Sequence, residues 1–534
     1  MLLILPDSKA PSSGRCPARP GHSPVRPAAR LALAVCGAWL ALLSSTTAAT
    51  YYIDFETGRD TNAGTSRTAP WKHAPGMAPF TGTYKPAPGD QLIFKGGVVW
   101  TNQMYVSDFK GTAASTITFR SAADWFKGTA YARPVLDMQS RVLDSGSSPH
   151  ASHRGNVVWV QGSEYVTIAD LEIRNYVWND PESRSQSDGF AVYFDTTTGC
   201  VISNVYAHSW AVRIGSDSKF GGFGAFNSAS PGSTVINSIV EGPNVLTTAP
   251  LHVSDIGCTG RGFCTSGAGV IGFSTVIGNE FSGITQGIWG GSIVRNNTVR
   301  DACDSFDKDS HENGTWQQNN TEFSGNVLRN LRAGVGAYFY PGWGGRTNQV
   351  MRVFNNIFQT IPQITVIQEG QIDESCEIWF VNNVIHRSHS AINLTSTKSG
   401  APFGALVFQN NLLISDNLDS SSPIVGNPTW PHKFVVIADE SKLGARYTNS
   451  HNLYRGASQV MAYGIIPSRL YQPSTNFAAA NQSGVNFSWL LDADRLGAPR
   501  PATGAWDIGT YQLGFEGGGP LPPGPVSGIQ LHRP

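Results

Sequence analysis

The chain has 534 residues, and only 14% of them are charged, whereas charged residues make up about 25% of an average soluble domain. The 40% hydrophobic and 10% aromatic residues exclude an intrinsically disordered chain, because they supply enough apolar surface to offset the entropy lost on folding. The 58 glycines and the low charge argue against a helical protein and favour β-structure with many tight turns.

The first segment reads as a leader. Arg26 and Arg30 precede the apolar run Leu31–Leu43, and small residues follow up to Ala49. This order is typical of a secretory signal peptide, so we expect residues 1–49 to be removed and the protein to be secreted or periplasmic. The apolar run is too short to span a bilayer, and membrane insertion is not expected. Without the leader, 33 basic and 37 acidic residues leave a net charge of −4, which argues against nucleic-acid binding.

Short apolar segments that each carry a polar anchor residue recur through the middle of the chain. From Asn297 to Asn411 the anchors follow one another at a nearly constant interval. Each unit is too small to bury its own apolar side, whereas stacked units bury a continuous core. We therefore expect a solenoid in which the anchor side chains hydrogen-bond from coil to coil. The anchors are Asp170, Asn204, Ser238, Asn279, Asn297, Asn326, Asn356, Asn383 and Asn411.

These repeats resemble the right-handed parallel β-helix superfamily of pectate lyases, pectinases, alginate lyases and mannuronan C5-epimerases. The opening stretch Tyr51–Lys72, the GDQLIFKGG segment from Gly89 and the closing stretch Asp494–Gly509 also look like the ends of secreted members. The resemblance implies an all-β fold, a single-stranded right-handed parallel β-helix with an N-terminal cap, over residues 50–515. We expect residues 516–534 to be a flexible Gly/Pro-rich tail.

Registering the coils on their anchors predicts two rows of outward side chains. Offsets of ten, twelve and fourteen residues from the anchors define the first row, whose intervening positions are apolar and should point inward. This row contains Asp307, Asp309, His311, Tyr338, Tyr340 and Gln368. The second row lies three residues past the anchors, with Arg332 between the two rows. It contains Arg300, Arg329, Gln359 and His386.

The two rows suit the removal of the C5 proton of a uronic acid residue, which needs a base, a cation on the carboxylate and an acid for the leaving oxygen. His311 would be the base, with Asp309 or Asp307 orienting its ring. A bidentate arginine would neutralise the carboxylate, and a tyrosine would donate a proton or stack on a sugar ring. The predicted catalytic residues are His311, Asp309, Asp307, Arg332 and Tyr340. The predicted substrate-binding residues are Arg300, Arg329, Tyr338, Gln368, Trp289, Trp343 and Lys308.

The segment Asp309-Ser310-His311-Glu312 is similar to the D-x-H-[DE] motif of mannuronan C5-epimerases. This similarity implies that His311 is the base and that Asp309 supports it. The chain departs from that family at Phe306, where the family has tyrosine, and at Tyr340, where the acid of the next coil falls. We therefore expect a secreted, monomeric polysaccharide lyase of carbohydrate metabolism that acts by β-elimination on an acidic polysaccharide.

Several alternatives stay open. Asp307, Asp309 and Glu312 would also suit calcium, the one cofactor we expect, because hard oxygen ligands bind that ion. The same acids would alternatively belong to a solvated loop, and Lys308 would be either a base or an ion-paired residue of the wall. The alternative functions are a uronate C5-epimerase, a glycoside hydrolase using Asp304 with two further acids, and a non-catalytic glycan-binding adhesin. A second site on the N-terminal coils would contain Asp188, Tyr193, Asp195, His208 and Arg213.

Five of the seven cysteines lie beyond the leader. Cys258 and Cys264 flank a Gly-rich loop and would form a disulfide in an oxidising compartment, whereas Cys200, Cys303 and Cys376 are expected to be buried as small hydrophobic residues. No C-x-x-C pair or H-E-x-x-H motif occurs, which argues against a zinc site.

Overall fold

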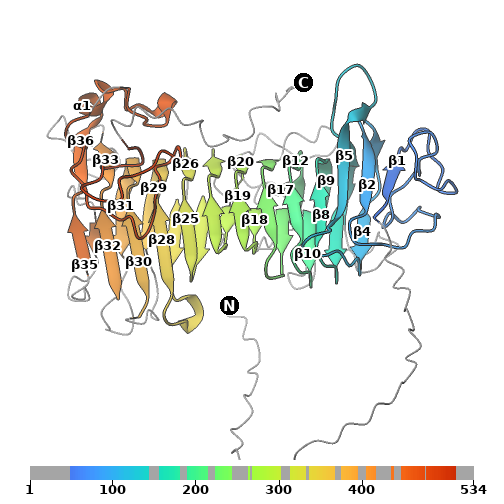
Figure 1. The fold of residues 1–534 in the computed structure, drawn as a ribbon, viewed down its shortest axis with the longest axis horizontal. Coiled ribbons are helices and arrows are strands. Elements are labelled where there is room, and N and C mark those ends of the chain that lie inside the picture. Colours follow the sequence, from blue (N-terminus) through green and yellow to red (C-terminus); the bar gives the residue numbers. More distant parts are fainter. Residues whose placement is uncertain are drawn as a thin grey trace, which may run out of the picture. The chain divides into compact units, whose positions relative to one another are not determined.

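Nearly all of the regular structure in the computed structural model is β-strand, stacked in chain order from β1 to β36 (Figure 1). The structure describes residues 48–143, 155–180, 189–214, 223–242, 263–264, 268–284, 286–301, 313–331, 336–366, 375–394, 404–415, 435–437, 447–474 and 477–512.

The first sheet is parallel, and its thirteen strands follow the order of the chain. Short strands with alternating burial dominate it, as expected when one face covers a core and the other faces solvent. Its strands are β1 (Thr50–Ile53), β2 (Gln91–Gly96), β5 (Ile117–Phe126), β8 (Val166–Ala169), β11 (Val201–Ser203), β15 (Thr234–Ile236), β19 (Thr275–Ile277), β22 (Ile293–Arg295), β25 (Thr321–Ser324), β28 (Val350–Phe354), β30 (Glu377–Val381), β32 (Ala405–Gln409) and β35 (Tyr447–Ser450).

A second parallel sheet follows the first in every coil. Its strands are β3 (Val99–Trp100), β6 (Val135–Val142), β9 (Glu172–Asp180), β12 (Tyr206–His208), β16 (Ile239–Glu241), β20 (Glu280–Ser282), β23 (Thr298–Arg300), β26 (Val327–Arg329), β29 (Ile357–Val366), β31 (Val384–Leu394), β33 (Leu412–Ser415) and β36 (Leu453–Gly456). Beside it, β13 (Ala211–Ile214) pairs with β9 and, in antiparallel fashion, with β17 (Phe263–Cys264).

The third parallel sheet completes each coil. Its strands are β4 (Met104–Ser107), β7 (Val158–Gln161), β10 (Gly189–Asp195), β14 (Phe223–Ser228), β18 (Ala268–Ile271), β21 (Gln286–Trp289), β24 (Thr315–Gln318), β27 (Ala337–Tyr340) and β34 (Val435–Ile437). The second halves of β29 and β31 also belong to it and join it to the second sheet. Parallel strands joined by such crossovers are right-handed in nearly all proteins. The predicted all-β right-handed parallel β-helix is confirmed.

Buried asparagines form the predicted ladder at the turn from the first sheet to the second. Each turn places one residue in the left-handed region, for example Asn296 at φ 55°, and the next residue is the ladder asparagine. The backbone N–H and Nδ2 of Asn297 both donate to Oδ1 of Asn326, at 2.9 and 3.0 Å. Nδ2 of Asn297 also donates to the Val276 carbonyl at 2.9 Å, so the buried amide is paired on both sides.

The ladder differs from the prediction at both ends. It runs on to Asn452, whose Oδ1 accepts two hydrogen bonds from Asn411 and which the repeat pattern missed. Asp170 and Asn204 are not ladder residues: they occupy the left-handed position one residue earlier, at φ 59° and 52°. Asn204 donates to Asp170 there at 2.7 Å. The one-residue offset arises because an acidic or amide side chain is tolerated in either position of this turn.

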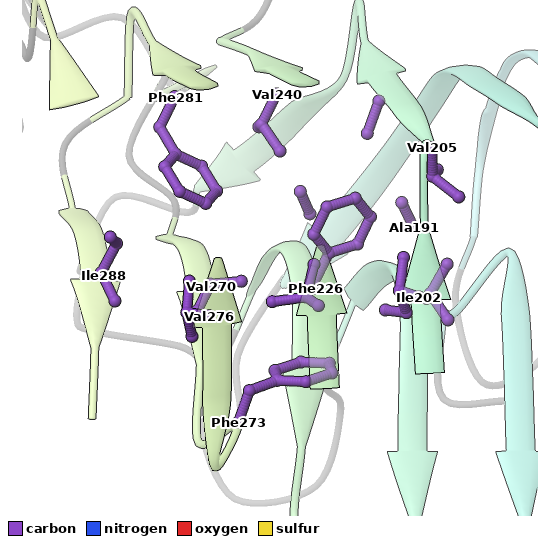
Figure 2. Packing of buried hydrophobic residues seen from close by; sticks show 14 of the residues in the cluster. Ala191, Ile202, Val205, Phe226, Val240, Val270, Phe273, Val276, Phe281 and Ile288 are labelled. Atoms are coloured by element: carbon purple, nitrogen blue, oxygen red, sulfur yellow. The ribbon is translucent and has the colours of Figure 1, made fainter. Parts of the chain in front are cut away.

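Aliphatic and aromatic side chains from all three sheets meet inside the coils and form one continuous core. Figure 2 shows part of it: Val276 from the first sheet, Phe281 and Val240 from the second, and Ile288 from the third. All four side chains are buried, and each lies at an inward phase of its short strand. Stacking the coils therefore replaces the large single core of a globular domain.

Each end of the solenoid is covered by irregular structure. At the N-terminal end the rings of Tyr51 and Trp71 stack at 4.6 Å. At the C-terminal end, α1 (Ala457–Met461), the 3-10 turn η4 (Pro467–Arg469) and the stretch up to residue 512 pack against the last coils. We call residues 457–512 the C-terminal cap. Its Arg500 is buried and hydrogen-bonded to backbone carbonyls, and burial lowers the pKa of Arg500 to about 10.

Cys200 and Cys376 are buried, as predicted. Cys258 and Cys303 lie outside the described residues, as does the side chain of Cys264, so the Cys258–Cys264 disulfide stays a prediction. In the described part of the chain, no helix is long and apolar enough to cross a bilayer.

Candidate functional site

Five aromatic side chains lie together on the outer face of the third sheet. Strand pairing puts Trp289 beside Trp316, and Trp316 beside Tyr338. The two indoles stack at 5.2 Å with an interplanar angle of 8°, and Tyr338 lies 5.2 Å from Trp316 on the other side. Tyr340 and Trp343 extend the group, with Trp343 edge-on to both Tyr340 and Trp316 at 4.8 and 5.7 Å. We call these five residues the aromatic platform.

Local sequence explains how the platform forms. In β24 and β27 the alternate residues Gln317 and Phe339 point into the core, which leaves Trp316 and Tyr338 outside. Trp343 begins a 3-10 turn, Trp343–Gly345, and the preceding Gly342 together with Gly344 and Gly345 have φ between 72° and 86°. This turn folds the chain back so that Trp343 covers Tyr340.

The platform offers apolar ring faces at its margins. Trp343 is 39% exposed and Trp289 is half-buried, whereas Tyr340 is 3% exposed beneath Trp343. Tyr338 and Tyr340 alternate with the inward Phe339 as the spacing predicts, but both are buried, at 9% and 3% exposed. A role for Tyr340 as a proton donor would require Trp343 to move aside, so support of the platform is the role that fits its position.

The predicted row of polar side chains on the second sheet is also present. Arg300, Arg329, Gln359 and His386 pair in register through β23, β26, β29 and β31. The members differ in surroundings. His386 is buried, and its Nδ1 lies 2.7 Å from the Tyr471 hydroxyl of the C-terminal cap, so it is removed from the outer face.

Arg300 is occupied by two carboxylates. It contacts Glu280 and Asp301, at 2.8 and 2.9 Å. Burial alone would lower the pKa of Arg300, but these hydrogen bonds raise it. For Asp301, burial acts to raise the pKa, and hydrogen bonds from Asn330 and Arg300 overcome that effect and lower it. Arg300 therefore stabilises the wall of the solenoid through these two ion pairs, whereas the sequence predicts that it contacts the substrate.

Arg329 is the member of this row that stays available. Its side chain is partly exposed, and no residue within the described ranges forms a hydrogen bond or ion pair with it. Its charge, together with that of Arg300, helps to lower the pKa of Asp301. A partly exposed guanidinium without a partner among the described residues can pair bidentately with the carboxylate of a bound ligand.

The remaining predicted residues lie outside the described ranges. Residues 302–312 connect the end of β23, beside Arg300 and Arg329, to Asn313, two residues before β24 and its Trp316. Asp307, Lys308, Asp309, His311 and Glu312 belong to this connection, while Arg332 and Gln368 belong to connections of the next two coils. The described residues contain no group of three metal-ligating side chains, and the calcium site stays a prediction because its ligands are elsewhere.

Two details of the predicted outer row are wrong. The strand residues paired with Tyr338 and Tyr340 are Trp316 and Gln318, not Asp309 and His311, because the connection before β24 is longer than the spacing rule assumes. On the following coil, Val366 pairs with the inward Phe339 and Thr365 takes the outward place beside Tyr338. The spacing rule, which places Gln368 opposite Tyr338, is thus three residues out of register there, and this odd number exchanges the inward and outward positions.

Sequence reasoning missed Trp316, the central ring of the platform. A signal was present, since Trp316 follows Trp289 at the interval of a single coil. It also missed Glu280 and Asp301 as partners of Arg300.

The backbones beside β21 and β24 approach each other closely. A Cβ on Gly287 would lie 2.0 Å from the Gly314 carbonyl oxygen. The glycine at this position permits the approach.

The alternative site on the N-terminal coils is divided between two sheets. Tyr193 and Asp195 lie on β10 of the third sheet, where Gln161 donates to Asp195 at 3.0 Å. His208 lies on β12 of the second sheet, 3.1 Å from Glu172. Arg213 is on β13, and Asp188 falls outside the described residues. The predicted five residues therefore do not form one cluster on a single sheet.

No family model matches the chain. Over 139 residues it is 28% identical to a lacto-N-biosidase of Bifidobacterium longum subsp. longum, a match that spans 24% of this chain and 8% of that protein. A solved lacto-N-biosidase of Eubacterium ramulus has a TM-score of 0.38 at 13% identity, over 76% of this chain and 68% of that one. A solved pectate lyase has a TM-score of 0.41 at 14% identity, over 88% and 98%. The parallel β-helix itself rests on the strand register of this chain.

Proposed function

We propose that this protein is a carbohydrate-active enzyme that cleaves a uronic-acid-containing polysaccharide by β-elimination. The observation that carries the proposal is Arg329, a partly exposed guanidinium with no partner among the described residues. It lies on the same coil as Tyr338 of the aromatic platform and next to the strand from which the His311 segment departs. A cation, a candidate base and sugar-stacking rings therefore belong to three successive coils.

The proposed chemistry assigns one task to each group. Arg329 pairs with the carboxylate of the uronate and stabilises the negative charge that spreads onto it when the C5 proton leaves. His311 takes that proton, and Asp309 holds the imidazole in the tautomer that accepts it. The bond from C4 to the glycosidic oxygen then breaks as the C4–C5 double bond forms, and the leaving oxygen takes a proton from the imidazolium of His311. Trp289 and Trp343 supply ring faces for the flanking sugars.

The proposal is tested by following the ultraviolet absorbance of the unsaturated product. We expect the full chain to generate this absorbance from at least one member of a panel of polyuronates, and His311→Asn to abolish it. His451→Asn is the matched control, because His451 is exposed beside β35, on the first sheet. Absorbance that persists in His311→Asn would contradict the assignment of the base. Deuterium incorporation at C5 without absorbance would replace the lyase with a C5-epimerase.

A second candidate function is glycoside hydrolysis. It is favoured by the 28% identity over 139 residues to a lacto-N-biosidase, which is a glycoside hydrolase. Hydrolysis needs two carboxyl groups on either side of the scissile bond, and Asp304, Asp307 and Asp309 would supply them. New reducing ends without ultraviolet absorbance would establish this alternative over the lyase.

We also propose that the protein acts outside the cytoplasm as a monomer, on the strength of its leader-like opening segment up to Ala49 and the polymeric substrate.

A further inference from the structure

An exposed tryptophan, Trp489, lies toward the C-terminal end of the first sheet, far from the N-terminal cap. Among the described residues, Trp489 exposes a larger fraction than any other large hydrophobic side chain, 62%. It belongs to the C-terminal cap, where its neighbours Phe487 and Leu491 are buried against the outer face of the first sheet. An exposed tryptophan becomes a candidate binding surface when further apolar groups join it in one patch.

The loop that carries Trp489 is held firmly. Asn486 donates from Nδ2 to the carbonyls of Pro501 and Gly504, at 3.1 and 2.9 Å. Its Oδ1 accepts from the backbone N–H of Ser488 at 2.8 Å, and Leu490 N–H donates to the Phe487 carbonyl at 2.7 Å. The indole is therefore presented on a fixed turn, so little conformational entropy would be lost when it binds a partner.

A second indole stands against the first. Trp379, on the outward face of β30, lies 4.8 Å from Trp489 with an interplanar angle of 82°. Its Nε1 donates to the Glu377 carboxylate at 3.0 Å, which fixes the orientation of the ring. We call Trp379 and Trp489 the tryptophan pair. Its two perpendicular rings form a corner that matches the apolar face and edge of a pyranose ring.

An available cation lies next to the pair. Arg352 of β28 is the strand partner of Trp379 and is exposed. No described residue makes a hydrogen bond or ion pair with the Arg352 side chain, although its charge helps to lower the pKa of Glu322. Glu322 is already occupied by Arg295, which binds it through two hydrogen bonds of 2.6 Å. Arg352 is thus placed to receive a carboxylate from outside the chain.

We propose that the tryptophan pair and Arg352 form a second, non-catalytic binding surface for an acidic glycan. The sugar ring stacks on Trp489 and Trp379, and the uronate carboxylate pairs with Arg352. This inference rests on the proposed function for its ligand class. The surface lies on the first sheet, whereas Arg329 and the aromatic platform lie on the second and third sheets. It therefore holds a stretch of polymer other than the one at the candidate active site, and raises the effective concentration of substrate there.

The surface is tested by affinity electrophoresis in gels that contain polygalacturonate or alginate, with methyl-esterified pectin as the uncharged counterpart. The proteins carry His311→Asn in addition, so that the polymer is not consumed. We expect Trp489→Ala to weaken retardation in the acidic gels about tenfold, which is the loss typical of truncating an aromatic anchor. Arg352→Gln should weaken it in the acidic gels and leave it unchanged in the esterified gel.

Met461→Ala is the matched control, because Met461 is 58% exposed in the same C-terminal cap but lies on α1. Retardation of Trp489→Ala equal to that of the parent protein would overturn the proposal, as would the absence of any retardation of the parent. A change of mass in sedimentation on Trp489→Ala would also overturn it, because the surface would then be an interface between copies of the chain.

Turnover is measured separately, on short soluble oligouronates with the native His311. Trp489→Ala should keep the parent kcat/KM on these substrates, and an equal loss on oligomer and polymer would place the residue in the active site instead. Binding without turnover would contradict the proposed function and leave this surface standing. Turnover without binding at the tryptophan pair would support the proposed function and overturn this binding surface.

Discussion

Arg300 and Arg329 occupy equivalent positions on neighbouring coils, yet their surroundings give them different roles. Arg300 satisfies Glu280 and Asp301, so it stabilises the wall and has little capacity for a third carboxylate. Arg329 has no such partner among the described residues and keeps its full charge available. Because the chain carries few charges, with 38 basic residues in 534, an arginine that is not neutralised by its neighbours has a large influence on where an anionic sugar binds.

The first prediction at this scale concerns Arg329. Arg329→Gln should lower kcat/KM on a polyuronate about 100-fold, because one preorganised charge at the developing anion is lost. Steady-state kinetics on the acidic polymer and on its methyl ester provide the measurement, and the ester should lose much less. Arg59→Gln, in an exposed N-terminal position, is the control. The same loss on both polymers would show that Arg329 does not recognise the carboxylate.

At the scale of elements, the turn between the first and second sheets is the unit that repeats most faithfully. A left-handed residue turns the chain, and the next residue buries its amide between coils, as Asn326 does. Each amide accepts from the coil before it and donates to the coil after it, so the ladder fixes the coil register as well as the turn. The strands on either side are very short, for instance β22 and β23.

The ladder predicts a large stability loss from one small change. Asn326→Ala removes the acceptor of two Asn297 donors and the donor to the Val294 carbonyl. We expect a fall in the free energy of unfolding of about 2–4 kcal/mol, because buried partners are left unsatisfied. Chemical denaturation followed by circular dichroism measures it. Asn102→Ala, whose side chain makes no such ladder contacts, should change stability little; equal losses in both variants would refute a special role for the ladder.

At the scale of the whole molecule, ion pairs and hydrogen bonds set the response to acid. Burial tends to raise the pKa of each partly buried carboxyl group, but the hydrogen bonds and positive charges around it lower the pKa below its ordinary value. Because these pKa values are lower in the folded than in the unfolded chain, the stability they contribute is present above the unfolded pKa, near about 4. It is lost as the pH falls through the folded values. The groups concerned are Asp54, Asp137, Glu172, Asp301 and Glu322.

We therefore expect the melting temperature to fall steeply below about pH 4. Differential scanning calorimetry between neutral and acidic pH measures the slope. Glu172→Gln should make the slope shallower, because Glu172 is held by Arg174 and His208 and loses that stabilisation on protonation. Glu164→Gln is the control, since its ion pair with Lys110 is exposed and contributes little. A slope unchanged in Glu172→Gln would assign acid unfolding to other groups.

The candidate site was predictable in part. The outward positions of Tyr338 and Arg329 follow from strand alternation and a fixed distance to the nearest asparagine, which are both local properties. The partnership of Trp316 with Tyr338 was not predicted, because it depends on the number of residues between β23 and β24. That connection has its own length in every coil, and sequence spacing cannot be carried across it. The partners of Arg300 were missed although they are close in register: Asp301 follows Arg300 in the chain, and Glu280 lies on the paired strand of the previous coil.

By itself the sequence determined the all-β solenoid, the position of its coils and most of the asparagine ladder, because these depend on short-range alternation and on a turn that needs an amide at one place. Only the tertiary structure decided which residues meet across coils: the ring contacts of the aromatic platform, the occupation of Arg300, the burial of His386 under the C-terminal cap and the tryptophan pair. These contacts join segments that are far apart in the chain, as Trp379 and Trp489 show. The physical reason is that stacking register and cap docking are set by the whole core, not by any one repeat.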